Sequence, residues 1–325
     1  MPEITMRQAI QRGLEEGLQN DSSVFIMGED IGKYGGAYAI TAGFLEKYGP
    51  KRIKDTPISE ATFVGAGVGA AVAGLRPVIE LMSISFSLVA FDQIVNMAAN
   101  IRYMAGGQVK VPMLIRAPTG AGMQLGATHS QSFETWLAEV PGMKTVVPST
   151  PYDALGLLRS ALKDDNPVLF AEPAGLYGTR GDVPDAHFVV PFGKASVQRQ
   201  GGDVTLISYG HGMRLLNAAA DELAARGIRA EVIDLRSLSP LDIETLVVSV
   251  QKTNRALTLD TARRTGGVMA EVAARIQEAA SDWLDGPVVR VGAEDVPWPY
   301  NRDLELEALP QVHDILDALQ KAYGI

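Results

Sequence analysis

Two kinds of segment alternate along the chain: short apolar runs, and longer stretches with apolar residues at helical spacing. In the first half the apolar runs are VFIMGED (24–30), RPVIELM (76–82), VPMLIRAP (111–118), KTVVPS (144–149) and PVLFAEP (167–173). The helical stretches include MRQAIQRGLEEGL (6–18), a long segment over 86–105, QSFETWLAEVPG (131–142) and PYDALGLLRSALKD (151–164). This alternation predicts parallel β-sheet with crossover helices, and near-continuous apolar strands predict a sheet covered on both faces.

The same alternation of apolar runs and helical stretches begins again in the second half of the chain. Residues 181–202 are rich in Gly, Pro and charged residues with weak periodicity, which is typical of a linker. Beyond them, DVTLISYG and AEVIDLRSL are predicted strands, and HGMRLLNAAADELAARG is a predicted helix between them. We therefore predict an α/β fold with two parallel-sheet domains, residues 1–180 and 203–325, joined by the linker.

Composition narrows the classes of function. The chain has 325 residues, no cysteine and a formal net charge of −9. Without cysteine, disulfides, thiolate zinc sites, iron–sulfur clusters and cysteine nucleophiles are excluded. The acidic balance and the lack of a Lys/Arg cluster argue against nucleic-acid binding. The start MPEITMRQAIQRGLEEG lacks the order of a signal peptide, and no apolar stretch reaches membrane length, so we expect a cytoplasmic protein.

The stretch DTPISEATFVGAGVGAAVAG (55–74) places one glutamate ahead of a run of Gly, Ala and Val. Gly65, Gly67 and Ala70 match G-x-G-x-x-A, so an NAD-binding oxidoreductase using the Gly65 run is one hypothesis. However, no apolar strand directly precedes the first glycine, and Ser59 predicts a helix N-cap that would put the glycines inside a helix. Such a helix can pack closely within the chain, or against a partner subunit or cofactor.

Glu60, the glutamate of this stretch, has two interpretations. An acid in the first turn of a helix complements the helix dipole, and many exposed glutamates do only that. Its neighbours Ile58 and Phe63 are apolar, however, and the residues beyond are small. A carboxyl in such surroundings loses water, which raises its pKa, so Glu60 is a candidate functional acid.

The four histidines have no metal-ligand spacing among them. His129 lies in a glycine-rich loop before a predicted helix, and α/β proteins place chemistry on loops at the ends of parallel strands. A solvent-facing or N-capping histidine is the alternative. His187, His211 and His313 are expected to be structural, with His211 a second candidate because it directly follows a strand.

Motifs spread over the whole chain resemble those of one family. They are GEDIGKYGGAY, DTPISE, VGAAVAGLRPVIE, AFDQIVNMAANIRYMAGG, VPMLIRAPTGAG, HSQSFETW, STPYDALGLL, DDNPVLFAEP, RTGG and EDVPWPYN. In this order they are similar to the β subunits of the thiamine-diphosphate-dependent 2-oxo acid dehydrogenases, which include the pyruvate, branched-chain and acetoin enzymes. Within the family we expect the pyruvate enzyme, with the branched-chain and acetoin enzymes as alternatives.

The resemblance implies a transketolase-like pyrimidine-binding domain followed by the transketolase C-terminal domain. It also implies an α₂β₂ heterotetramer that shares thiamine diphosphate between α and β subunits. The α subunit would supply the G-D-G…N element that binds magnesium and the diphosphate, since this sequence has none. We expect the chain to be active only with an α subunit. The enzyme would decarboxylate a small 2-oxo acid and pass the acyl group to the lipoyl domain of a separate acyltransferase.

The family's functional residues carry over by matched motif. The glutamate of DTPISE hydrogen-bonds N1′ of the aminopyrimidine, and this implies that role for Glu60. Phe86 matches an aromatic residue that packs on the aminopyrimidine, and Ile58 and Met82 match neighbouring residues of the cofactor pocket. His129 matches an active-site histidine that handles the substrate or the acyl transfer. Some β subunits also hold a structural potassium ion by carbonyl groups, and the matching positions are Met113, Ala161, Asp164 and Asn166.

Some positions depart from the family pattern. Thr128 precedes His129 where many pyruvate enzymes have glutamine or glutamate, and Thr261 follows Asp260 where relatives often have a second acid. These departures leave the substrate and the role of the C-terminal loops open. A non-catalytic interaction subunit is a further alternative, which predicts that changes at Glu60 or His129 leave activity intact.

Overall fold

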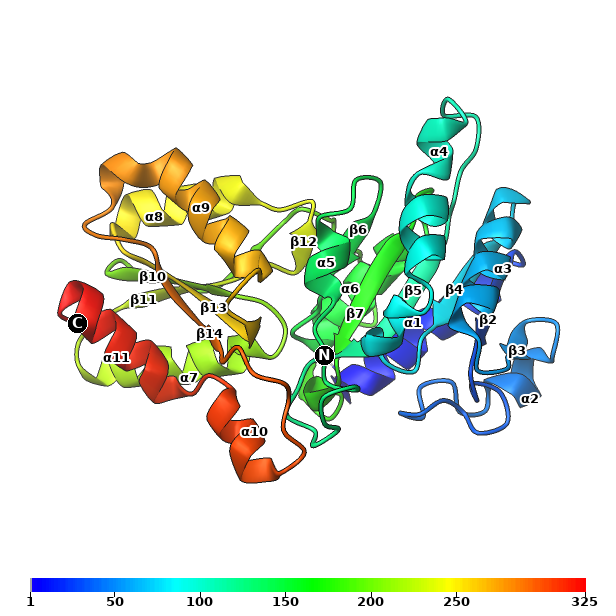
Figure 1. Cartoon of the computed structure of the whole chain (residues 1–325), viewed down its shortest axis with the longest axis horizontal. Helices are drawn as coiled ribbons and strands as arrows, with labels where there is room; N and C mark the ends of the chain where they lie inside the picture. Colours follow the sequence, from blue (N-terminus) through cyan, green and yellow to red (C-terminus); the bar gives the residue numbers. More distant parts are fainter. Residues whose placement is uncertain (1) are drawn as a thin grey trace. The chain divides into compact units, whose positions relative to one another are not determined.

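The computed structural model describes residues 2–325, which form two compact α/β units (Figure 1). The first unit extends to Thr119 and also contains Phe133–Phe192. The second consists of Gly120–Ser132 and Gly193–Ile325. No helix among the described residues is both long enough and apolar enough to span a membrane.

Strands and helices alternate in the first unit, as predicted. Its strands are β1 (Glu3–Thr5), β2 (Val24–Gly28), β3 (Ile53–Asp55), β4 (Arg76–Glu80), β5 (Leu114–Thr119), β6 (Lys144–Val146), β7 (Val168–Pro173) and β8 (Arg180–Asp182). Its α-helices are α1 (Met6–Asn20), α2 (Phe44–Tyr48), α3 (Glu60–Val72), α4 (Ile101–Met104), α5 (Glu134–Ala138) and α6 (Pro151–Ala161). Other helical turns are η1 (Ile84–Leu88), the π-helix η2 (Gln93–Ala99) and η3 (Ala174–Leu176).

The main sheet of the first unit is parallel, with strand order β6–β7–β5–β4–β2–β3. Neighbouring residues of a strand point to opposite faces. On β4, Val78 joins the apolar cluster of α1 and α6, whereas Ile79 contacts Gly67 of α3. The sheet is therefore covered on both faces, which confirms the prediction from its near-continuous apolar strands.

The long helix predicted over 86–105 is present in part: residues 91–104 are helical except at Asn100, but they do not form one continuous α-helix. η1 ends at Leu88, the π-helix occupies Gln93–Ala99, and α4 begins only at Ile101. The side chain of Asn100 donates a hydrogen bond to the carbonyl of Val95 at 3.0 Å, five positions back. Such side-chain contacts compete with regular helical hydrogen bonding, which the apolar periodicity does not reveal.

The second unit repeats the α/β pattern. Its strands are β9 (Ser196–Arg199), β10 (Val204–Ser208), β11 (Ala230–Asp234), β12 (Ser237–Ser239), β13 (Ala256–Arg263) and β14 (Val289–Ala293). Its helices are α7 (Gly212–Ala225), α8 (Ile243–Thr253), α9 (Val268–Ala280), η4 (Ser281–Trp283), α10 (Arg302–Ala308) and α11 (Val312–Tyr323). The sheet has the order β14–β13–β10–β11–β9, with α8 and α9 packed together and α7 packed on α11 (Figure 1).

Residues 181–202, which we expected to form a linker, contribute strand residues to both units. β8, which begins one residue earlier, pairs antiparallel with β1 in the first unit. β9 pairs antiparallel with β11 at the edge of the second sheet. Weak periodicity at these positions reflects short edge strands, because such strands need no continuous apolar face.

A buried ion cluster connects three strands of the first sheet. Arg116 of β5 binds both carboxylate oxygens of Glu172 on β7, at 2.8 and 2.7 Å, and also pairs with Glu80 on β4. The hydroxyl of Tyr177 donates to the same Glu172 carboxylate at 2.6 Å. Burial, partly offset by the Arg116 charge, raises the pKa of Glu80. The cluster buries two carboxylates beside one guanidinium, so its arginine is essential for charge balance.

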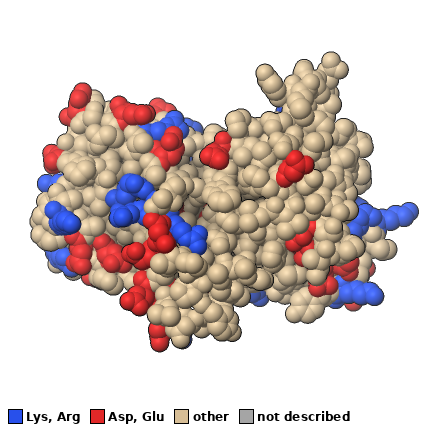
Figure 2. Space-filling view, in the orientation of Figure 1, with Lys and Arg blue, Asp and Glu red and all other residues tan. Residues whose placement is uncertain are grey.

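Charged side chains of both signs share the exposed surface. On the face drawn in Figure 2, Lys and Arg are interspersed with Asp and Glu and form no single basic area among the residues described. Arg199 and Asp221, for example, form an ion pair at 2.7 Å in the second unit. Such exposed pairs contribute little to stability.

Candidate active site

Residues of the candidate site follow three neighbouring strands of the first sheet. β3, β2 and β4 are adjacent and parallel, so their carboxyl ends lie at one edge. Glu29 follows β2, Thr56 follows β3, and Met82 follows β4. Open parallel sheets bind ligands at this edge, which makes it the candidate site.

Glu60 is the first residue of α3 and is only 5% exposed. Ser59 occupies the predicted N-cap position, but its side chain caps no backbone N–H and lies 2.7 Å from the Thr62 hydroxyl instead. Phe63 is buried beside Glu60, whereas Ile58 is 84% exposed. The predicted burial of Glu60 is therefore present, but Ile58 does not provide it within this chain.

Glu29 is a second buried carboxyl that our sequence analysis missed. It is 6% exposed, and burial together with the negative charges of Glu60 and then Asp30 raises the pKa of Glu29 to about 7. Glu29 is therefore partly protonated near neutral pH. The available signal was the position of the acid directly after the apolar run VFIMG, at the end of a parallel strand.

Several buried polar atoms at this edge have no hydrogen-bond partner among the described residues. They are Oε1 of Glu29, Oγ1 of Thr56 and Oγ of Ser87. Buried polar groups are nearly always hydrogen-bonded, and leaving one unsatisfied costs about 1–3 kcal/mol. The three atoms therefore fit a polar ligand, and the aminopyrimidine of thiamine diphosphate has the hydrogen-bonding groups that they require.

Two of the three apolar residues predicted for the cofactor pocket follow β4. Met82 lies between β4 and η1 and is half-buried, and Phe86 within η1 is also half-buried. Ile58 precedes α3. These residues and the Glu60–Glu29 pair thus belong to the same unit.

The glycines of the Gly65 run lie inside α3, as the N-cap position predicted. A dinucleotide fingerprint requires its first glycine at the turn between strand and helix, so this geometry rules out the NAD-binding hypothesis for the run. A Cβ atom on Gly67 would lie 2.7 Å from Cδ1 of Ile79, so this glycine permits close packing of α3 on its own sheet. Gly69 has no atom within 4 Å of such a Cβ position and faces outward.

His129 belongs to the loop Gly120–Ser132, which is part of the second unit. The His129 side chain is exposed, and its Nδ1 lies 2.8 Å from the hydroxyl of Thr128. The backbone N–H of His129 donates to the Gly126 carbonyl at 3.3 Å. The loop thus presents the imidazole to solvent in a hydrogen-bonded orientation.

The remaining histidines are separate from these residues. His211 is half-buried at the start of α7, where burial and then the charge of Arg214 lower its pKa. His187 is exposed, and His313 lies 3.4 Å from Asp314 on α11. Within residues 2–325, no group of three or more acidic or histidine side chains is arranged to hold a metal ion.

The residues matched to a potassium site surround the turn after α6. They are Met113, Ala161, Asp164 and Asn166, all in the first unit. The Met113 carbonyl accepts a hydrogen bond from the Val168 N–H at 2.9 Å, and the Asp164 carbonyl accepts one from Arg76 at 2.8 Å. A carbonyl oxygen has two lone pairs, so these contacts leave room for a cation, which stays a prediction.

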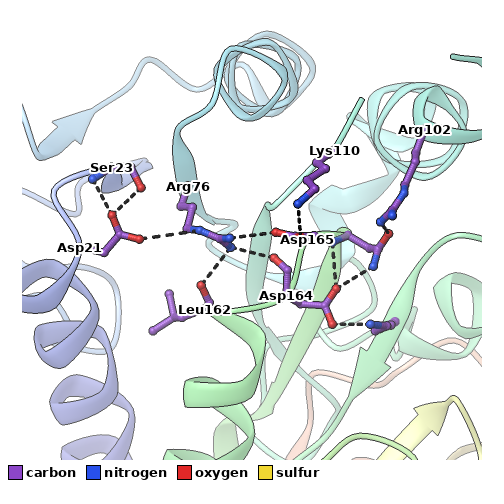
Figure 3. Close-up of polar contacts among 10 residues, drawn as sticks. Asp21, Ser23, Arg76, Arg102, Lys110, Leu162, Asp164 and Asp165 are labelled. Atoms are coloured by element: carbon purple, nitrogen blue, oxygen red, sulfur yellow. Dashed lines mark hydrogen bonds and ion pairs between the residues drawn. The ribbon is translucent and has the colours of Figure 1, made fainter. Parts of the chain in front are cut away.

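Cationic side chains hold the same turn (Figure 3). Arg76 and Lys110 contact the carboxylate of Asp165 at 2.9 and 2.7 Å, and Lys144 pairs with that of Asp164. Burial opposes the charged form of Asp164, but hydrogen bonds from Lys144 and Asn166 outweigh it and lower its pKa. Ion pairs within the protein therefore already balance the acidic groups of the turn.

Two family models match the chain, one for each unit. The transketolase pyrimidine-binding domain matches residues 2–179, and the transketolase C-terminal domain matches residues 193–315. Among solved structures, a chain described as a split gene transketolase, inactive beta4 tetramer, is similar with a TM-score of 0.79 and 26% identity, over 99% of this chain and 98% of that one.

Curated relatives cover the chain from end to end. The mitochondrial pyruvate dehydrogenase E1 component subunit beta-1 of Arabidopsis thaliana is 46% identical over 98% of this chain and 89% of its own length. The corresponding beta subunits of Rhizobium meliloti and Gracilaria tenuistipitata are each 44% identical over 98% of this chain, and over 70% and 99% of their own lengths. The chain therefore belongs to the transketolase-like family of pyruvate dehydrogenase E1 component β subunits.

Proposed function

We propose that the chain is the β subunit of a pyruvate dehydrogenase E1 component and forms, with an α subunit, an α₂β₂ enzyme that uses thiamine diphosphate. The observation that supports this best is the buried Glu60–Glu29 pair at the carboxyl edge of the first sheet. A buried carboxyl with a pKa near 7, beside a second buried carboxyl at a ligand-binding edge, is suited to acid–base catalysis at a nitrogen heterocycle.

The residues of this edge have distinct roles in the proposal. When bound, thiamine diphosphate supplies the electron sink for decarboxylation of a 2-oxo acid. Glu60 would hydrogen-bond N1′ of the aminopyrimidine, and the negative charge of Glu60 favours the protonated form of Glu29. Phe86, Met82 and Ile58 would pack against the ring and exclude water.

A partner subunit completes the site. Ile58, Leu88 and Val89 are 84%, 48% and 56% exposed, although they lie beside the buried Glu60 and the half-buried Phe86 in the sequence. Exposed apolar residues beside a binding site favour an interaction surface, and covering these would also remove water from the carboxyl pair. In the proposal the α subunit covers them and supplies the magnesium site, and His129 acts in acyl transfer to the lipoyl domain of an acyltransferase.

The test is Glu60→Gln in the enzyme reconstituted with its α subunit. We expect pyruvate turnover to fall by about 100-fold or more, since loss of a positioned acid–base group has effects of about 10²–10⁴-fold. Glu139→Gln, which changes an exposed glutamate of the same unit, is the matched control. Turnover of Glu60→Gln close to wild type would refute the assigned role, and comparison of pyruvate with branched 2-oxo acids tests the substrate.

A further inference from the structure

The loop that presents His129 is held by residues of the second unit. The chain leaves the first unit after Thr119 and rejoins it at Phe133. The loop is closed at its base by a hydrogen bond from the N–H of Gly120 to the carbonyl of Gln131, at 3.2 Å. The position of His129 therefore depends on which residues of the second unit bind this loop.

The carboxylate of Glu305, on α10, is one group that binds the loop. Glu305 is 1% exposed, and its two oxygens accept hydrogen bonds from the N–H groups of Gly122 and Gln124, at 2.9 and 3.0 Å. Gly122 has φ of 99°, a backbone conformation that other residues rarely adopt. Hydrogen bonds to an ionised acceptor are about twice as strong as neutral ones, so this carboxylate fixes the first half of the loop.

Arg263, at the end of β13, is the second residue that binds the loop. Its Nη1 donates to Oε1 of Gln131 at 3.0 Å, and its Nε donates to the carbonyl of Val296 at 3.1 Å. The guanidinium carbon lies 5.4 Å from the centre of the Trp298 ring, and Trp298 is buried. The Trp298 ring and the Val296 carbonyl thus hold the Arg263 side chain in place, while its Nη1 donates a hydrogen bond to the loop.

The side chain of Gln131 connects Arg263 to the turn that contains His129. While Oε1 of Gln131 accepts from Arg263, its Nε2 donates to the carbonyl of Ala127 at 2.8 Å. The amide therefore closes the turn from Ala127 to Gln131, and Thr128, His129 and Ser130 lie within it. Because the Thr128 hydroxyl also contacts Nδ1 of His129, both the backbone and the ring of the histidine are held.

We propose that Arg263 is a positioning residue for His129, acting through Gln131. The inference rests on the proposed function, in which His129 acts in the reaction. A purely structural arginine would stabilise the second unit without any dependence on the histidine. The two explanations differ in whether the effect of changing Arg263 requires His129 to be present.

The experiment is a double-mutant cycle in the reconstituted α/β enzyme, measuring pyruvate-dependent acyl transfer. We expect Arg263→Gln to lower kcat about 10-fold with little change in KM for pyruvate, because small displacements of a reacting group cost about 10–100-fold. In the His129→Ala background the same change should have no further effect. Gln131→Leu should reproduce Arg263→Gln, and Arg264→Gln, which alters the neighbouring exposed arginine, is the matched control.

Equal losses from Arg263→Gln in both backgrounds, or an equal loss from Arg264→Gln, would overturn the inference. If His129→Ala alone retains wild-type turnover, the proposed role of His129 fails, and amide hydrogen exchange of residues 120–132 then decides the positioning separately. Faster exchange there in Arg263→Gln but not in Arg264→Gln is expected. Unchanged exchange would show that Arg263 does not hold the loop.

Discussion

Replacing Glu29 by glutamine should change how the stability of the protein depends on pH. Burial and the charge of Glu60 raise the pKa of Glu29 from 4.5 to about 7. At about 1.4 kcal/mol for each tenfold change in the ionisation constant, this rise corresponds to about 3 kcal/mol against the charged form. Glu29 as a whole residue is 6% exposed.

The sign follows from proton linkage. Between pH 4.5 and 7 the folded protein binds more protons at Glu29 than the unfolded chain does, so the free energy of unfolding falls as pH rises. Below pH 4.5 the group is protonated in both states and imposes no cost. Above pH 7 the full cost of about 3 kcal/mol applies, and glutamine, which has no charge to bury, avoids it.

The assay is urea unfolding of the cofactor-free protein from pH 4.5 to 8.5. Relative to Glu29→Gln, the wild type should lose about 2–3 kcal/mol of unfolding free energy over this range, most of it before pH 7.5. Glu60→Gln should reduce the loss, because it removes one of the charges that raise the pKa of Glu29. Parallel curves for wild type and Glu29→Gln would refute the assignment of a buried, protonated Glu29.

Two further predictions concern other parts of the first unit. Arg116→Met leaves the carboxylates of Glu80 and Glu172 buried without a cation, and we expect it to destabilise the protein by about 3–5 kcal/mol in thermal unfolding; a loss below about 1 kcal/mol would contradict the charge-balance argument. If the turn at Asp164 binds potassium, replacing NaCl by KCl at equal ionic strength should raise the melting temperature. Equal melting temperatures in the two salts would count against that site.

The sequence alone predicted several local features correctly. The alternation of apolar runs and amphipathic stretches indicated two parallel α/β units, because strand and helix periodicities are local properties. Ser59 and the small residues beyond Glu60 indicated a helix starting at Glu60, and α3 begins there. The same reasoning failed within 86–105, where Asn100 bonds the Val95 carbonyl and the helix is interrupted. The spacing of apolar residues indicates which face of a helix is apolar, but it does not indicate such polar contacts.

What the sequence determined by itself is the list of elements, their amphipathic faces and the motifs that identify the family. Tertiary structure alone decided which polar groups meet. Glu29 and Glu60 interact because β3, β2 and β4 are neighbours, and strand order is not encoded in the periodicity of any one strand. Likewise, Glu305 binds the loop of His129 from 183 positions away along the chain. Such pairings depend on how the whole chain folds, whereas helix and strand propensities depend on a few adjacent residues.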